Sequence, residues 1–164
     1  MKRTKKHYDP LQHLALSAIQ NTPFAGALRL LKTKLPDARS LSTQMAFDRV
    51  YRFFVTDGKQ PSIQSNGLCN YRGENDSRCA IGVLIPNNLY SPFMEGVPVI
   101  ELLKSYPRLR DYLRRIPRRF LAALQHAHDE TAKAFLAKGI SFRDLITDEL
   151  YNIAFQYHLY IPRS

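Results

Sequence analysis

The sequence predicts a mainly α-helical protein that folds as a single domain with one irregular insert. Apolar residues recur at helical spacing along most of the chain, and prolines and capping residues bound these stretches. The helical spacing disappears between about residues 61 and 98, which we treat as the insert. A chain of 164 residues with 45% apolar side chains is long enough to bury a core without a metal ion or a disulfide to hold it.

The N-terminal quarter combines a basic tail with two predicted helices. Residues 1–8 contain four Lys or Arg side chains and no apolar periodicity, so we expect a flexible tail. The helical domain, residues 9–164, then opens with Asp9-Pro10, a pair typical of helix starts. Leucines and alanines at helical spacing predict helices over about 10–21 and 22–35, which we expect to form a helical hairpin.

A third helix is predicted to begin after Ser42, because serine is a preferred residue at the position that caps a helix N-terminus. Ala46, Val50 and Phe54 recur four residues apart and share one side of this helix, which is typical of a segment that buries one face. We expect it to end at Asp57-Gly58.

The insert contains turn residues and short apolar pieces. Segments 68–72 and 78–81 flank a polar turn and could pair as a small β-hairpin. A short helix is predicted over residues 81–85. Several prolines follow it, so we expect the chain from there to the end of the insert to be irregular.

Four further helices are predicted after the insert. They are expected over residues 99–105, 109–115, 117–138 and 142–157. Pro107 and Pro117 separate the first three, and Gly139 closes the third. Ser141, with Asp144 three residues later, resembles a capping box that opens the last helix.

The composition also indicates in which cellular compartment the protein is found. No apolar run reaches the roughly 18 residues that a membrane span needs, and the basic start is not followed by the apolar stretch of a signal peptide. We therefore expect a cytoplasmic protein without membrane contact, in which Cys69 and Cys79 are reduced thiols.

The net charge of +10 is concentrated in the tail and in segment 104–119, which carries seven basic side chains and one acidic side chain. We call the basic residues of this segment the arginine stripe. They are Lys104, Arg108, Arg110, Arg114, Arg115, Arg118 and Arg119. Arginine contacts phosphates through its planar fork and stacks on bases, and Tyr106 and Tyr112 are interleaved, so the stripe favours nucleic acid as a partner.

Two other interpretations of the arginine stripe remain open. Its guanidinium groups can pair with acidic residues of the same chain, such as Asp144, Asp148 and Glu149, while their stems cover apolar surface. An acidic host protein would also fit the charge, which would make the chain a helical adaptor or inhibitor.

Several short motifs occur together between about Phe47 and Asp129. They are Cys69-Asn70-Tyr71-Arg72-Gly73, Cys79-Ala80-Ile81-Gly82, Leu84-Ile85-Pro86, Met94-Glu95-Gly96 and Leu124-Gln125 with His128-Asp129. This combination resembles a family of small, uncharacterised bacterial and bacteriophage proteins that share the pattern Cys-x-Tyr-Arg-Gly, Cys-Ala-x-Gly, Leu-Ile-Pro, Met-Glu-Gly and Leu-Gln-x-x-His-Asp. The resemblance implies a phage or bacterial origin and no particular activity, and we expect the protein to be encoded by a phage or mobile element.

Two cysteines and two histidines supply the usual residue types of a zinc site, but their spacing argues against one. Nine residues separate Cys69 from Cys79, and His126 and His128 lie about 200° apart around a helix, so both cannot face one ion. A mixed set of the two cysteines, His128 and Glu95 is the alternative to cysteines that are simply buried. We favour buried cysteines and expect neither a metal nor a cofactor.

A thiol-dependent enzyme is the main catalytic alternative. Cys79 lies at the start of a short predicted helix beside Arg78, and both the helix end and the guanidinium would stabilise a thiolate. His128 could serve as its base. Asp129 is expected to point about 100° away from His128 and therefore not to orient its ring.

A ligand pocket in the insert is the third hypothesis. Tyr71, Arg72 and Arg78, together with Glu95, could bind a nucleotide through stacking and forked hydrogen bonds. The alternative is that Arg72 pairs internally with a nearby carboxylate. No glycine-rich phosphate loop supports the pocket.

Taken together, these features predict a small, basic, non-enzymatic accessory protein that binds a polyanion, with nucleic acid favoured over a nucleotide ligand. Aromatic and apolar residues near the C-terminus suggest a homodimer. They are Phe155, Tyr157, Tyr160 and Ile161.

Overall fold

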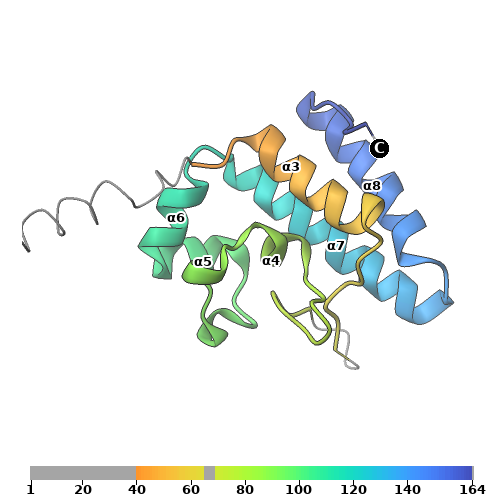
Figure 1. The fold of residues 1–164 in the computed structure, drawn as a ribbon, viewed down its shortest axis with the longest axis horizontal. Coiled ribbons are helices and arrows are strands. Elements are labelled where there is room, and N and C mark those ends of the chain that lie inside the picture. The colour runs from red at the N-terminus through yellow and green to blue at the C-terminus, as the bar shows by residue number, and fades with distance from the viewer. Residues whose placement is uncertain (1–39, 65–68, 164) are drawn as a thin grey trace, which may run out of the picture. The chain divides into compact units, whose positions relative to one another are not determined.

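The computed structural model describes residues 40–64 and 69–163, and these are mainly helical (Figure 1). The chain consists of two compact units, Met1–Ala38 and Arg39–Ser164, and the described residues belong to the second. The basic tail and the two helices predicted before residue 36 lie outside the described residues, as does the expected domain start at residue 9.

Helix α3 (Thr43–Tyr51) begins where the sequence predicts. Its cap is Ser42, whose Oγ accepts a hydrogen bond from the Met45 amide at 3.2 Å. The helix widens into one π-helical turn, η1 (Arg52–Thr56), because the Asp57 amide donates to the carbonyl five residues back. Together the two segments confirm the predicted third helix.

The insert contains three isolated β-bridges rather than a hairpin. Within the described residues these join Pro61 with Arg78, Ile63 with Cys69, and Arg72 with Arg78. Of the expected pairing of 68–72 with 78–81, only the Arg72–Arg78 bridge forms among the described residues of these segments. Helix formation from Ala80 onward removes the second half of the expected strand.

Helix α4 (Ala80–Leu84) confirms the short helix predicted near residues 81–85 and passes very close to the preceding chain. A Cβ atom on Gly82 would lie 1.8 Å from the carbonyl oxygen of Tyr71, so this crossing requires glycine. The prolines that follow produce two short 3₁₀ turns, η2 (Asn87–Leu89) and η3 (Pro92–Met94).

The four helices predicted after the insert are all present, the second of them two residues earlier in the chain than expected. They are α5 (Val99–Ser105), α6 (Pro107–Leu113), α7 (Arg118–Lys138) and α8 (Phe142–Tyr157). Gly139 ends α7 at a φ of +64°, and Ser141 Oγ caps α8 by accepting from the Asp144 amide at 3.4 Å.

The core lies between α3, α4, α7 and α8. Figure 1 shows the long α7 behind α3, with α8 running beside both, and α7 packs most extensively against α8. Phe54 and Phe120 are fully buried, and the rings of Phe54 and Phe142 meet edge to face at 5.3 Å. Helix α5 packs against both α6 and α7, and Figure 1 shows α5 and α6 at one end of the described helices, so the arginine stripe lies at that end.

None of the helices in residues 40–64 and 69–163 combines the length with the apolar character that crossing a bilayer requires.

Candidate functional site

The arginine stripe runs from the end of α5 across α6 to the first turn of α7, and all seven of its side chains are exposed. Lys104 pairs with Glu101 at 2.7 Å, and Arg110 Nε lies 3.6 Å from Asp111. The other five arginines have no carboxylate within 4.0 Å among the described residues. They are Arg108, Arg114, Arg115, Arg118 and Arg119.

The intramolecular pairing that the sequence left open is not formed by these five groups in the described part of the chain. None of Asp144, Asp148 and Glu149 makes an ion pair with a described residue of the stripe. As far as the described residues are concerned, these guanidinium groups therefore retain their capacity to bind an external anion.

The tyrosines interleaved in the stripe have structural contacts. Tyr106 and Tyr112 are both half-buried and pack against the core, and the Tyr112 hydroxyl accepts a hydrogen bond from Arg49 of α3 at 2.8 Å. Stacking on bases would thus fall to the arginines rather than to these rings.

Helix α7 has two positively charged side chains at its N-terminus, where the helix dipole already produces a positive potential. Its cap residue, Pro117, provides no side-chain hydrogen bond, and its first turn contains Arg118 and Arg119 but no acidic residue. Because the amide groups of a helix N-terminus favour negative charge, this arrangement is unfavourable for the isolated chain and favourable beside an anion.

Glu95 organises the insert. Its carboxylate accepts hydrogen bonds from the Tyr71 amide at 2.6 Å, from the Arg72 amide at 3.1 Å and from the Tyr90 hydroxyl at 2.8 Å. Burial and the bond to Glu95 raise the pKa of Tyr90. Glu95 therefore joins η3 to the chain segment that precedes α4.

Most of the polar groups proposed for a ligand pocket have partners within the protein, although the buried Arg72 Nε has none among the described residues. The Arg72 guanidinium donates to the Ile85 carbonyl at 3.1 Å and lies 4.0 Å from the centre of the Tyr90 ring. Arg78 pairs with Asp76 at 2.9 Å, and the Tyr71 hydroxyl donates to the backbone of Val97. These contacts favour the structural interpretation of the residues over nucleotide recognition.

A cavity of about 410 Å³ nevertheless opens beside the insert. It is lined by side chains from the insert and from α7, including Cys69, Cys79, Tyr71, Gln125 and Asp129. The sequence predicted the two cysteines and Tyr71 as candidate residues but not Gln125, whose Oε1 also accepts a hydrogen bond from the Val99 amide at 3.0 Å.

Cys79 is placed for capping rather than for nucleophilic attack. Its Sγ accepts a hydrogen bond from the Gly82 amide at 3.3 Å, and only 4% of the residue is exposed. Burial raises the pKa of the Cys79 thiol to about 12, although backbone hydrogen bonds act in the opposite direction. The expected stabilisation of a thiolate by Arg78 is not found, because that guanidinium pairs with Asp76.

His128 lies in the core beside an unexpected partner. Its ring is fully buried, with centroids 5.6 Å from both Phe54 and Phe142, while His126 is exposed, as the 200° separation predicts. Asp129 was expected to point away, yet its Oδ1 lies 3.3 Å from His128 Nδ1. The prediction was wrong because Nδ1 is the ring nitrogen nearer the backbone and can be reached from the adjacent residue.

Cys69 completes a cluster with these two residues. One ligand atom from each of Cys69, His128 and Asp129 lies within 4.8 Å of the others. Burial raises the pKa of the Cys69 thiol, and the neighbouring Asp129 adds to the effect. Sequence spacing did not reveal the cluster, because Cys69 is far from the other two along the chain.

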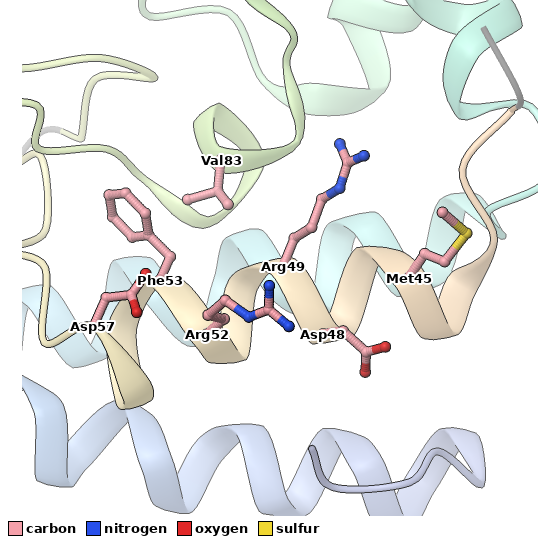
Figure 2. A pocket seen from close by; sticks show the side chains of 7 residues that line it. All are labelled: Met45, Asp48, Arg49, Arg52, Phe53, Asp57 and Val83. Carbon is pink, nitrogen blue, oxygen red and sulfur yellow. The ribbon is translucent and has the colours of Figure 1, made fainter. Parts of the chain in front are cut away.

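A second cavity, of about 310 Å³, lies between α3 and α4. Figure 2 shows Arg49 extending from α3 on the same side as Val83 of α4, with Phe53 beside Val83. Since Arg49 also contacts Tyr112, this groove adjoins α6. No pattern in the sequence predicted this groove.

No family model, curated protein or solved structure matches this chain.

Proposed function

We propose that this protein is a small, non-enzymatic accessory protein that binds nucleic acid through the arginine stripe. The observation that carries the proposal is the set of five exposed stripe arginines without a carboxylate partner among the described residues. A bacterial or phage origin, as the motif pattern implies, is part of the same proposal.

The placement of the charges supports backbone contact rather than base reading. Arg114 and Arg115 lie in the turn between α6 and α7, and Arg118 and Arg119 follow within one helical turn. Such closely spaced guanidinium groups suit successive phosphates, and the positive end of α7 adds to their potential. We therefore expect binding that depends strongly on salt and little on sequence.

The test measures binding of a fluorescent oligonucleotide of mixed sequence by anisotropy at several salt concentrations. In the test variant Arg114, Arg115, Arg118 and Arg119 are all replaced by Gln. If each contacts one phosphate of a duplex, the slope of log K against log salt should become shallower by about 3 to 4.

A matched control removes four positive charges elsewhere on the described surface. It replaces four exposed residues that make no ion pair in the described part of the chain, namely Arg52, Lys138, Arg143 and Arg163. This control should lose much less affinity than the stripe variant. Equal losses would show that net charge alone drives binding, and unchanged binding by the stripe variant would exclude the stripe as the site.

A further inference from the structure

The cluster of Cys69, His128 and Asp129 has the chemistry and spacing of a metal site. A thiol, an imidazole and a carboxylate are the three ligand types that zinc takes from proteins. The ligand atoms come from two parts of the chain, the first part of the insert and the middle of α7, and all lie within 4.8 Å of one another.

The distance between His128 Nδ1 and Asp129 Oδ1 suits two ligands of one ion and is long for the hydrogen bond that the two atoms form without it. At 3.3 Å it exceeds the usual length of about 2.9 to 3.0 Å for a nitrogen donor and an oxygen acceptor. Two ligands of a tetrahedral zinc ion, each about 2.0 to 2.1 Å from the metal, are separated by about 3.3 Å. The two side chains thus already span one edge of such a site.

The cysteine needs only a small adjustment to join them. A sulfur ligand in tetrahedral zinc lies about 3.6 Å from its nitrogen and oxygen neighbours, so the 4.8 Å limit leaves at most about 1.2 Å to close. Cys69 is half-buried in the insert rather than packed inside a helix, so its side chain can make this shift.

We infer that Cys69, His128 and Asp129 bind a divalent transition-metal ion, zinc being the best fit, and that water from the adjoining cavity takes the fourth position. Cys69 and Asp129 both line the 410 Å³ cavity, so a bound ion borders it. On binding, the Cys69 thiol releases its proton to solvent and coordinates as a thiolate.

The charges of this arrangement balance. A thiolate and a carboxylate together neutralise the two positive charges of the ion, and His128 coordinates as a neutral ring. Sulfur and nitrogen ligands select zinc or cobalt over magnesium and calcium, which require oxygen donors.

The test titrates Co²⁺ into the untagged, full-length protein after treatment with a chelator, and then displaces it with Zn²⁺. We expect about one cobalt ion per chain, a thiolate-to-cobalt charge-transfer absorption in the near ultraviolet, and intense visible bands typical of tetrahedral coordination. Excess Mg²⁺ should not displace the cobalt.

Two ligand variants and one control assign the site. Cys69→Ser should abolish the charge-transfer absorption, and Asp129→Asn should weaken zinc binding at least about tenfold. Cys79→Ser removes the other thiol while keeping a side chain that caps α4, so it should bind cobalt like the unmodified protein.

Circular dichroism of each metal-free variant establishes that it is folded, and Cys69→Ala replaces Cys69→Ser if the serine variant is not. The inference is overturned if the unmodified protein binds no cobalt, if the absorption survives in folded Cys69 variants, or if Cys79→Ser loses it. None of these measurements involves nucleic acid, so they are independent of the proposed function.

Discussion

Glu95 and Gly82 illustrate how single residues hold the insert against the helices. The Glu95 carboxylate serves three donors from two segments, and Gly82 lets the backbone at Tyr71 approach α4 without a side chain between them. Both belong to motifs that attracted functional hypotheses. Their contacts show that such motifs can be required by packing alone.

Replacing Gly82 by Ala should destabilise the protein severely. The added Cβ would meet backbone atoms of Tyr71 at 1.8 and 2.7 Å, and backbone cannot move aside as a flexible side chain can. We expect a loss of about 3 kcal/mol in the free energy of unfolding, measured by urea denaturation.

Gly96→Ala provides the comparison for this prediction. Gly96 has a φ of +73°, and a Cβ atom added there would meet no described atom within 4 Å. We therefore expect only a backbone strain of about 1 kcal/mol. A Gly82→Ala variant as stable as Gly96→Ala would show that α4 and the insert do not pack as described.

At the scale of elements, α7 combines a buried face with an electrostatically unfavourable start. Its interior residues, such as Phe120 and Leu124, hold it in the core, so packing compensates for the missing cap and the two arginines. A helix start that lowers stability yet lies on an exposed basic surface is typical of a segment retained for binding.

Arg119→Glu should therefore stabilise the protein while weakening nucleic-acid binding. The substitution removes a positive charge from the first turn of α7 and adds a negative one, which we expect to raise the free energy of unfolding by about 1 kcal/mol at low salt. Denaturant titration gives the stability, and oligonucleotide anisotropy gives the affinity.

Arg163→Glu makes the same change of charge outside the helices and controls for the lower net charge. It should alter stability less than Arg119→Glu does. If Arg119→Glu lowers stability, then the guanidinium makes a favourable contact and the helix-dipole argument for this surface fails.

At the scale of the whole molecule, positive charge is divided between the arginine stripe and the N-terminal segment. Residues 1–38 carry seven Lys or Arg side chains and two Asp residues. The unit Arg39–Ser164 contains the buried core and the stripe. If both regions contact the same polyanion, their contributions to salt dependence should add.

A fragment of residues 39–164 tests this division. We expect it to unfold cooperatively and to bind an oligonucleotide with lower affinity and a shallower salt dependence than the full chain. Its remaining binding should still require the four stripe arginines replaced above.

Two results would contradict that expectation. Non-cooperative unfolding of the fragment would show that residues 1–38 are needed for the core. Binding equal to that of the full chain would show that the basic N-terminal segment makes no contact with the polyanion.

The local sequence was sufficient to predict most of the described helices, because their start and end signals are short-range. Ser42, Ser141 and Gly139 each act within one turn of their own helix, and the described helices follow these signals closely. The expected hairpin failed because pairing of strands depends on partners outside the local segment, and helix formation at Ala80 competed successfully.

For the candidate sites, too, some features follow from the sequence alone and others depend on the tertiary structure. Sequence alone determined the density of positive charge in the arginine stripe, since charge is a property of composition. Tertiary structure decided which arginines lack a carboxylate partner among the described residues. It also brought Cys69 close to His128 and Asp129. Side chains distant in the chain come together only through packing of the core, and local residue patterns do not encode those distances.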